Sequence, residues 1–412
     1  MIGLMTERPK IAIFGEHEPK TIAQLNDVAS RARRAALMAD GHLGYVMPIG
    51  GVAAYREQVS VVGVGFDIAC GNAAIRTDLT VEKNVDLVER LPTLADEIQS
   101  TVSFGMGRKN RADDAPVDHP LFQSAAWEAV PGHAREALRS KARAQLGTVG
   151  SGNHYVDVFA DETGAIWVGV HFGSRGFGHS VASGFLALAQ GAKWDARVPE
   201  REALLPLAMP IGQDYWALMT LAGEYAYAGR EWVARKVVGI LGGREMELVH
   251  NHHNFAWREK HDGEDVIVVR KGATPAFPGQ KGFVGGSMGD NAVIVQGTVS
   301  RQPETQDLQR LALYSTVHGA GRVMSRTEAA GKRNWKTGKV LKPGKVSPEM
   351  MQKWVREKGV ILRGGGLDES PHVYRRLPDV LTAQKRTIEV LHTLKPLIVV
   401  MAGANEFDPY KD

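Results

Sequence analysis

Strand-like and helix-like segments follow one another irregularly in this sequence, and glycine-rich motifs separate many of them. The chain has 412 residues, of which 46 are glycine. A doubly wound parallel sheet requires a regular alternation of strand and helix, which this order does not provide. The sequence therefore predicts an α+β fold with mixed sheets, whose chemistry lies at strand ends and in glycine-rich loops.

The composition is sufficient for a large hydrophobic core. Hydrophobic residues make up 43% of the chain, and no repeat, heptad stretch or low-complexity linker divides it. We therefore expect residues 1–412 to form one large domain. No segment approaches the roughly 20 apolar residues needed to span a bilayer. The N-terminus also lacks the basic start and long apolar run of a signal peptide, so we expect a cytoplasmic protein with no membrane partner.

Local patterns predict the individual elements. Helical apolar spacing is present over residues 21–39, 85–99, 215–241 and 378–394, and another helix is expected before Leu146. Strand patterns are present at residues 10–14, 59–64, 73–75, 155–159, 165–170, 266–269, 292–295 and 397–400. The segments 155–159 and 165–170 are expected to pair as a hairpin.

One stretch, residues 322–346, is strongly basic. Its cationic residues are Arg322, Arg326, Lys332, Arg333, Lys336, Lys339, Lys342 and Lys345, and Glu328 is the only acid among them. Its glycines and proline predict a loop. A basic loop attracts phosphate polymers, although a solvated loop without a ligand has the same composition. Its position directly after the motif that contains His318 favours a nucleic-acid contact.

The only cysteine, Cys70, cannot form an intrachain disulfide. It lies three positions after Asp67 in the segment GFDIACG, which follows a buried type of strand. In a turn, both side chains could point at one ion. A lone cysteine is more often a small buried hydrophobe, so this pair alone does not decide between the two interpretations.

Several histidines lie in similar settings. His154 follows a glycine-rich turn in GSGNHYVD, and His171 ends a strand in VGVHFGSRG. The segment HNHHN has the composition of a metal site, although each histidine alone could be structural. Adjacent histidines point in different directions, so only one of His252 and His253 should be a direct ligand.

His318 lies in STVHGAGR, between a Ser-Thr pair and two glycines. Such a loop lets the backbone come close to a phosphate, and the imidazole could attack or bind an electrophile. A structural loop histidine would fit the same motif. Taken together, the Asp, Cys and His candidates suit Mn²⁺, Zn²⁺, Co²⁺ or Fe²⁺. Their wide separation favours an open catalytic site over a closed structural zinc site.

Eight segments, in this order, resemble the RtcB family of RNA-splicing ligases from about Val46 to near the C-terminus. They are GVGFDIACGN, GTVGSGNHYVDV, HFGSRGFGH, NHHNF, RKGATPAF, GGSMG, STVHGAGRVMSR and ESPHVYRRL. The resemblance implies a single RtcB-like ligase domain with glycine-rich active-site loops. It implies an enzyme that uses GTP and two Mn²⁺ ions. Its reaction joins RNA 3′-phosphate or 2′,3′-cyclic phosphate ends to 5′-hydroxyl ends through a guanylylated histidine. The partners would be broken RNAs, such as tRNA halves or damaged RNA, and an archease-like activating protein.

The resemblance also assigns roles to individual residues. The implied metal ligands are Asp67, Cys70, His154, His171 and His253, where His253 is chosen because it directly precedes Asn254. The implied nucleophile is His318. The positions that surround the nucleotide are Asn153, Asp157, Ser287, Gly319, Gly321 and Tyr374. The RNA contacts that we predict are Arg175, for its fork-shaped guanidinium, and Lys332, Arg333 and Lys336.

Three residues depart from the family pattern. Asp157 replaces a glutamate that contacts guanine, Ala292 replaces a serine, and Met401 stands where a lysine reaches the nucleotide. The nucleotide pocket is therefore predicted to be altered. Two alternatives to the ligase remain: a metal phosphoesterase that opens cyclic phosphates without sealing, and a non-catalytic RNA-binding paralogue.

Overall fold

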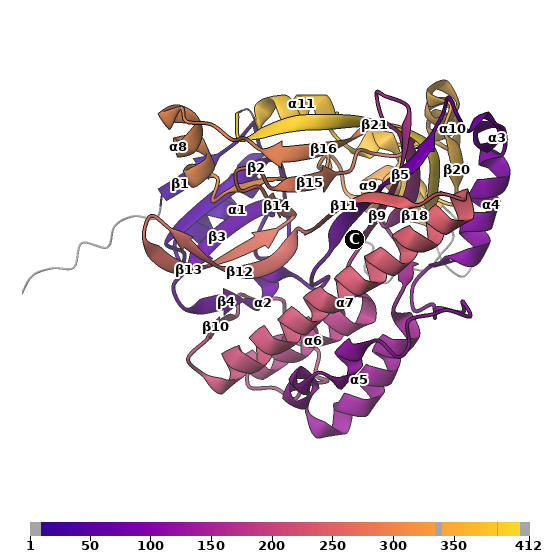
Figure 1. Ribbon diagram of the computed structural model, residues 1–412. Helices are drawn as coiled ribbons and strands as arrows, with labels where there is room; N and C mark the ends of the chain where they lie inside the picture. Colours follow the sequence, from indigo (N-terminus) through magenta and orange to yellow (C-terminus); the bar gives the residue numbers. More distant parts are fainter. Residues whose placement is uncertain (1–9, 334–339, 385, 404–412) are drawn as a thin grey trace, which may run out of the picture.

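The computed structural model describes residues 10–333, 340–384 and 386–403, and it contains two large mixed sheets with helices beside them (Figure 1). This arrangement confirms the predicted α+β class. The first sheet has the strand order β1-β2-β3-β13-β12. Its strands are β1 (Lys10–Ile13), β2 (Arg34–His42), β3 (Ile49–Tyr55), β12 (Asn254–His261) and β13 (Glu264–Lys271).

The second sheet has the order β11-β5-β9-β8-β21-β16-β15, and β20 pairs with β21. Its strands are β5 (Gly71–Thr80), β8 (Tyr155–Ala160), β9 (Ala165–Phe172), β11 (Glu245–His252), β15 (Lys281–Val284), β16 (Ala292–Gly297), β20 (Ile361–Arg363) and β21 (Ile388–Met401). The two end strands, β11 and β15, contact each other. The sheet therefore curls on itself around Phe159, Trp167 and Phe283, which are buried together.

Four two-stranded pairs complete the β structure. They are β4 (Gln58–Ser60) with β10 (Leu204–Pro206), β6 (Ser103–Phe104) with β7 (Thr148–Gly150), β14 (Ala273–Pro275) with β17 (Ser315–Val317), and β18 (Gly331–Arg333) with β19 (Val340–Pro343). The pair β14–β17 matters for the site, because β17 ends directly before His318 and also contacts β2.

The helices are mostly short, except for α7. They are α1 (Pro19–Ala29), α2 (Val61–Val64), α3 (Val85–Glu89), α4 (Leu91–Thr101), α5 (Gly132–Gln145), α6 (Arg175–Ala189), α7 (Pro210–Leu241), α8 (Pro303–Leu311), α9 (Arg326–Ala330), α10 (Pro348–Lys358) and α11 (Leu377–Ala383). Helix α7 packs across β5 and β9 (Figure 1). It therefore contributes to both large hydrophobic clusters, one with α6 and the first sheet and one with α4 and the second sheet.

The helix predicted over residues 21–39 is wrong in its second half. Helix α1 ends at Ala29, and β2 begins at Arg34. Strand β2 pairs with β1 on one side and β3 on the other, and its residues from Ala35 to Gly41 are all buried. A strand that is covered on both faces shows a continuous apolar run, which periodicity cannot distinguish from a buried helix.

The other two errors have related causes. The helix predicted at 378–394 ends at Ala383, and β21 begins at Ile388 after a turn in which Arg386 has a φ of 62°. Pairing of β21 with β16 overrides the local spacing there. The strand predicted at 59–64 changes into helix α2 after Ser60, whose side chain accepts a hydrogen bond from the Gly63 amide and caps the helix.

The basic segment 322–346 is more ordered than the predicted loop. It contains helix α9 and the antiparallel pair β18–β19. Serine 325 caps α9 by accepting a hydrogen bond from the Glu328 amide, which supplies the local signal for this helix. Lys336 and Lys339 lie outside the described residues.

Candidate active site

Four neighbouring strands of the curled sheet bring candidate metal ligands to one edge. Cys70 lies directly before β5, and His154 lies directly before β8. His171 is the penultimate residue of β9, and His253 follows β11. The strands β11, β5, β9 and β8 are successive and antiparallel, so a strand start and its neighbour's end lie side by side. Segments far apart in sequence thereby meet at one place.

The side chains of this group come close enough to share an ion. The Cys70 Sγ atom lies 3.7 Å from Nε2 of both His154 and His171. Their ligand atoms all lie within 4.8 Å of one another. Asp67 joins the group, because its Oδ2 lies 3.1 Å from His154 Nε2. A thiolate, imidazoles and a carboxylate together suit a borderline divalent metal.

Contacts at Nδ1 orient the imidazole rings of His171 and His154 toward Cys70. His171 Nδ1 lies 2.6 Å from Asn72 Oδ1, and the Asn72 amide nitrogen donates to the Phe283 carbonyl. The Asn72 oxygen must therefore accept from His171 Nδ1–H. His154 Nδ1 lies 3.0 Å from the Val149 carbonyl oxygen, which can only accept. In both rings Nε2 faces the Cys70 Sγ atom, and His154 Nδ1 also lies 3.0 Å from a guanidinium nitrogen of Arg175.

His253 and His252 face different partners. The centroid of the His253 ring lies 5.2 Å from that of His171 and 4.9 Å from that of His318, and its buried Nδ1 has no hydrogen-bond partner among the described residues. Burial lowers the pKa of His253, which keeps the ring neutral. His252 instead accepts from Arg230 at 2.8 Å and stacks on Tyr227. The structure thus places His253 beside the metal group.

The protonation of Cys70 and Asp67 depends on their surroundings. Burial, together with the neighbouring Asp67 charge, raises the pKa of the Cys70 thiol well above its ordinary range. Although burial opposes it, contact with His154 lowers the pKa of Asp67 overall. A divalent cation at this group would displace the thiol proton, which would couple metal binding to proton release.

His318 is held by a carboxylate that the sequence did not single out. Asp40, in β2, is fully buried and lies with its Oδ2 2.6 Å from His318 Nδ1. The same oxygen accepts from the backbone amides of His318 and Gly319, at 3.0 and 3.2 Å. Burial raises the pKa of Asp40, but the contacts with His318 outweigh it and lower the pKa overall. The ionised carboxylate accepts Nδ1–H, so the neutral form of the ring carries its lone pair on Nε2.

The residues predicted around a nucleotide are only partly gathered here. Asn153 is exposed, with its Nδ2 3.4 Å from His171 Nε2, and Gly319 follows the nucleophile candidate directly. Gly321 has a φ of +74° and lies against the Asp40 carbonyl, where a Cβ would clash. Ser287 donates to Asp290, and Tyr374 bonds Arg322 and Glu369; among the described residues, no hydrogen bond joins either side chain to His318.

The three departures from the family pattern are all buried. Asp157 has an Oδ1 atom without a hydrogen-bond partner, and burial raises its pKa well above the ordinary value. Ala292 packs in the interior of the curled sheet with Phe283. Met401 packs with Met288 in a separate hydrophobic cluster.

The predicted RNA contacts lie at different distances from the metal group. Arg175 has a φ of 56°, and its guanidinium lies 3.0 Å from His154 Nδ1. Its guanidinium occupies the space next to Gly150, and its buried Nε has no hydrogen-bond partner in the part of the chain that the structure describes. Lys332 is exposed on β18 and Arg333 ends that strand, whereas Lys336 lies outside the described residues. Arg326, at the start of α9, approaches Gly152 and so brings the basic segment to the edge of the site.

Comparison with known proteins identifies a family for this chain. A family model described as tRNA-splicing ligase RtcB matches residues 20–402. The chain belongs to the RtcB family.

The similarity to individual relatives covers most of each protein. A tRNA-splicing ligase RtcB from Archaeoglobus fulgidus is 33% identical, over 88% of this chain and 86% of the relative. An RNA-splicing ligase RtcB from Escherichia coli K12 is 30% identical, over 89% of this chain and 90% of the relative. A tRNA-splicing ligase RtcB from Thermococcus kodakarensis is 31% identical, over 88% and 87%.

Some residues that organise this RtcB site were missed from the sequence. Besides Asp40 and Asn72, they include Asn254, whose side chain donates to the Asp67 carbonyl at 3.3 Å and accepts from the Gly272 amide at 2.7 Å. A lone aspartate inside the apolar run of β2 was a usable signal for Asp40. Nothing local marks Asn72, because its role depends on the pairing of β5 with β9.

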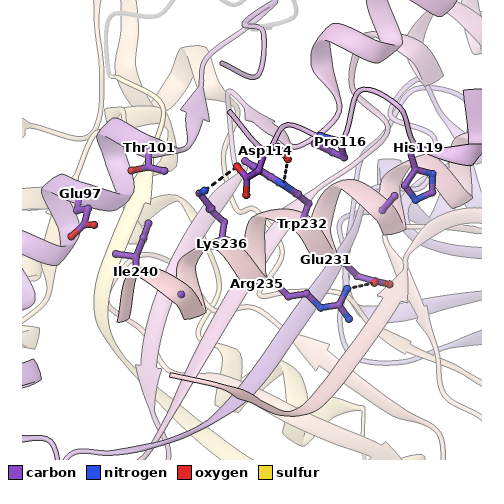
Figure 2. Close-up of a pocket in the computed structure, with 12 residues that line it drawn as sticks. Glu97, Thr101, Asp114, Pro116, His119, Glu231, Trp232, Arg235, Lys236 and Ile240 are labelled. Atoms are coloured by element: carbon purple, nitrogen blue, oxygen red, sulfur yellow. Dashed lines mark hydrogen bonds and ion pairs between the residues drawn. The ribbon is translucent and has the colours of Figure 1, made fainter. Parts of the chain in front are cut away.

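One hollow of this RtcB chain lies between α7, the end of α4 and the loop 114–119 (Figure 2). It is lined by Glu97, Asp114, Trp232, Arg235 and Lys236 among others, and by none of the predicted site residues. The polar side chains there bond one another, as in the pairs Lys236–Asp114 and Arg235–Glu231. The hollow is therefore distinct from the metal group. Among the described residues, no helix is long and apolar enough to cross a membrane.

Proposed function

We propose that this chain is a GTP- and Mn²⁺-dependent RNA ligase that joins RNA 3′-phosphate or 2′,3′-cyclic phosphate ends to 5′-hydroxyl ends. One observation carries the proposal. His318 is held by Asp40 at 2.6 Å, and its ring lies 4.9 Å from the ring of His253, beside the Cys70 group. A nucleophile with a free Nε2 next to metal ligands is what nucleotidyl transfer to histidine requires. Membership of the RtcB family supports the same reaction.

The donor set fits the implied metal. Asp67, Cys70, His154, His171 and His253 would hold it, and the buried Nδ1 of His253 has no other partner. When bound, divalent ions would offset the negative charge of the phosphates. Asn72 and the Val149 carbonyl orient the rings of His171 and His154 for this purpose.

The residues of the chain then perform the transfer. Asp40 accepts Nδ1–H of His318 and stabilises the positive charge that develops on the ring. Nε2 of His318 attacks the α-phosphorus of GTP, so that an N–P bond forms and the bond to pyrophosphate breaks. The RNA 3′-phosphate next displaces the histidine and takes the GMP. The RNA 5′-hydroxyl finally attacks this activated end, releases GMP and leaves a phosphodiester. A cyclic phosphate would first be opened by water.

The remaining predicted residues would bind the two substrates. Asn153, Asp157, Ser287, Gly319, Gly321 and Tyr374 would surround the nucleotide, and the buried Oδ1 of Asp157 has no hydrogen-bond partner among the described residues. Arg175 would hold an RNA phosphate beside His154, while Lys332, Arg333 and Lys336 would contact the RNA farther along. An archease-like protein is proposed as an activating partner.

The test is the intact mass of the protein after incubation with GTP and Mn²⁺. We expect a gain of one GMP, which is absent in His318→Ala. A control variant, His392→Ala, removes a histidine that pairs with Glu162 outside this site and should keep the adduct. If the wild type opens a cyclic phosphate but gains no GMP, the chain is a phosphoesterase and the ligase proposal is wrong. If it binds RNA and does neither, the chain is a binding paralogue.

A further inference from the structure

A completely buried arginine lies directly behind the candidate metal group. Arg230, in α7, has no exposed surface, and its guanidinium makes four hydrogen bonds. Nη1 donates to the Ala69 carbonyl at 2.9 Å and to the Phe172 carbonyl at 2.6 Å. Nη2 donates to His252 Nδ1 at 2.8 Å, and Nε donates to His250 Nε2 at 3.0 Å.

The acceptors of Arg230 belong to the three segments that carry ligand candidates. Ala69 directly precedes Cys70, Phe172 directly follows His171, and His252 directly precedes His253. These residues stand at the ends of β5, β9 and β11, which are adjacent in the sheet. The register pairs Gly71 with both Phe172 and His252, so one planar group spans all three strand ends.

Packing alone does not explain why an arginine occupies this buried position. None of its four hydrogen bonds goes to a carboxylate, and a buried cation that bonds neutral groups is costly. Burial lowers the pKa of Arg230 to about 10, which leaves it charged at neutral pH. Its Nε acceptor, His250, lies with Nδ1 3.5 Å from a Glu231 oxygen. An apolar side chain of similar volume would fill the space without that cost. What distinguishes arginine here is the set of four hydrogen bonds that its guanidinium donates.

We propose that Arg230 is a positioning residue that fixes Cys70, His171 and His253 relative to one another for metal binding. The proposal rests on the metal site of the proposed function. Residues behind metal ligands typically change metal affinity about 10- to 100-fold when they are replaced. Arg230 differs from Asn72 and the Val149 carbonyl, which each orient one ring, because it bonds three ligand-bearing segments together.

The experiment measures Mn²⁺ affinity by titration calorimetry, without GTP or RNA, in Arg230→Lys and Arg230→Met. Lysine keeps the charge but cannot reach four acceptors in a fork. We expect Mn²⁺ binding to weaken by about 10- to 100-fold in both variants. The matched control is Arg235→Met, on the same helix, where the half-exposed arginine pairs with Glu231 and Glu245. It should bind Mn²⁺ as the wild type does.

Two further readouts separate positioning from general stability. The melting temperature without metal shows whether a variant is folded. A double mutant with Cys70→Ala measures the coupling. If Arg230 acts by positioning Cys70, the two losses of Mn²⁺ affinity do not add, whereas independent destabilisation predicts that they add. If both Arg230 variants fail to fold, His250→Ala removes only the Nε acceptor and should weaken Mn²⁺ binding to a smaller extent.

The outcomes are distinct from those of the GMP test. Folded variants with wild-type Mn²⁺ affinity would overturn the role of Arg230 and leave the ligase proposal intact, as would an unchanged His250→Ala protein. A wild type that binds Mn²⁺ but forms no GMP adduct would overturn the ligase while the effect of Arg230 could still be measured. A wild type that binds no divalent ion would overturn both.

Discussion

The carboxylate of Asp40 is the group closest to the proposed nucleophile. Three hydrogen bonds converge on its Oδ2, from His318 Nδ1 and two backbone amides. We expect Asp40→Asn to slow GMP adduct formation by about 10- to 100-fold, because a hydrogen bond to a charged group is worth roughly 1.5–3 kcal/mol. Quenched-flow mass spectrometry with GTP measures this rate. Asp262→Asn, at a surface turn, is the control, and an equal loss there would contradict the role of Asp40.

The side chain of Asp157 is shorter than the glutamate that the resemblance predicts there, and this difference should affect nucleotide choice. A carboxylate reads guanine by accepting from N1–H and the exocyclic amine, two donors that adenine does not present together. Asp157 is one methylene shorter than glutamate, and loss of one such bond would reduce discrimination by about ten- to a hundredfold. We expect GTP to be preferred over ATP in adduct yield, and Asp157→Glu to sharpen the preference. An unchanged GTP/ATP ratio in the variant would show that the pocket already compensates.

The same residue predicts a pH effect on stability. Burial raises the pKa of Asp157 above its ordinary value of 3.8, so the folded chain binds this proton more tightly than the unfolded chain. The free energy of unfolding should therefore fall as the pH rises above the unfolded-state value. Asp157→Asn removes this dependence. Its melting temperature should exceed that of the wild type at pH 8 and match it near pH 3, and a lower value at pH 8 would contradict the cause.

At the scale of elements, the basic segment 322–346 can be tested as a unit. Lys332 is exposed on β18, and Arg333 follows it. Reversing the charge of Lys332, Arg333 and Lys336 should weaken RNA binding and flatten its salt dependence, since each lost phosphate contact removes counterion release. Fluorescence anisotropy at several salt concentrations measures both. Adduct formation with free GTP should be unchanged.

A matched triple variant controls for net charge. Lys20, Lys83 and Lys260 are exposed on other elements, and their reversal changes the total charge equally. We expect it to lower the affinity for RNA far less and to leave the salt slope unchanged. Equal effects of the two triple variants would show that only total charge matters and that the segment is no RNA contact.

Elements with a clear local signal were predicted well from the sequence, and those that depend on tertiary pairing were not. The hairpin β8–β9 and the long helix α7 lie where periodicity placed them. Strand β2 is buried on both faces and was mistaken for helix, and β21 depends on its pairing with β16. The residues of the candidate site divide in the same way. Motifs marked Cys70 and His318, whereas Asp40 and Arg230 act through contacts that exist only after β2 and α7 have packed.

At the scale of the whole molecule, the ligand candidates connect distant parts of the chain. Binding of a metal to the folded state alone stabilises that state, by about 2.7 kcal/mol when free metal is 100 times the dissociation constant. We therefore expect Mn²⁺ to raise the melting temperature and EDTA to reverse the increase, both measured by differential scanning fluorimetry. Cys70→Ala should fold but lose most of the increase. A full Mn²⁺-dependent increase in that variant would exclude Cys70 as a ligand.

The antiparallel order of β11, β5, β9 and β8 also fixes when the metal group can form during synthesis. A nascent chain that ends at residue 200 already contains Asp67, Cys70, His154 and His171, but it lacks His253 and all of α7. Strand β11, which carries His253 to the edge, pairs with β5 from the N-terminal part of the chain. The last ligand candidate therefore leaves the ribosome after α7, so the complete group of candidates can assemble only in a chain that is already more than half made.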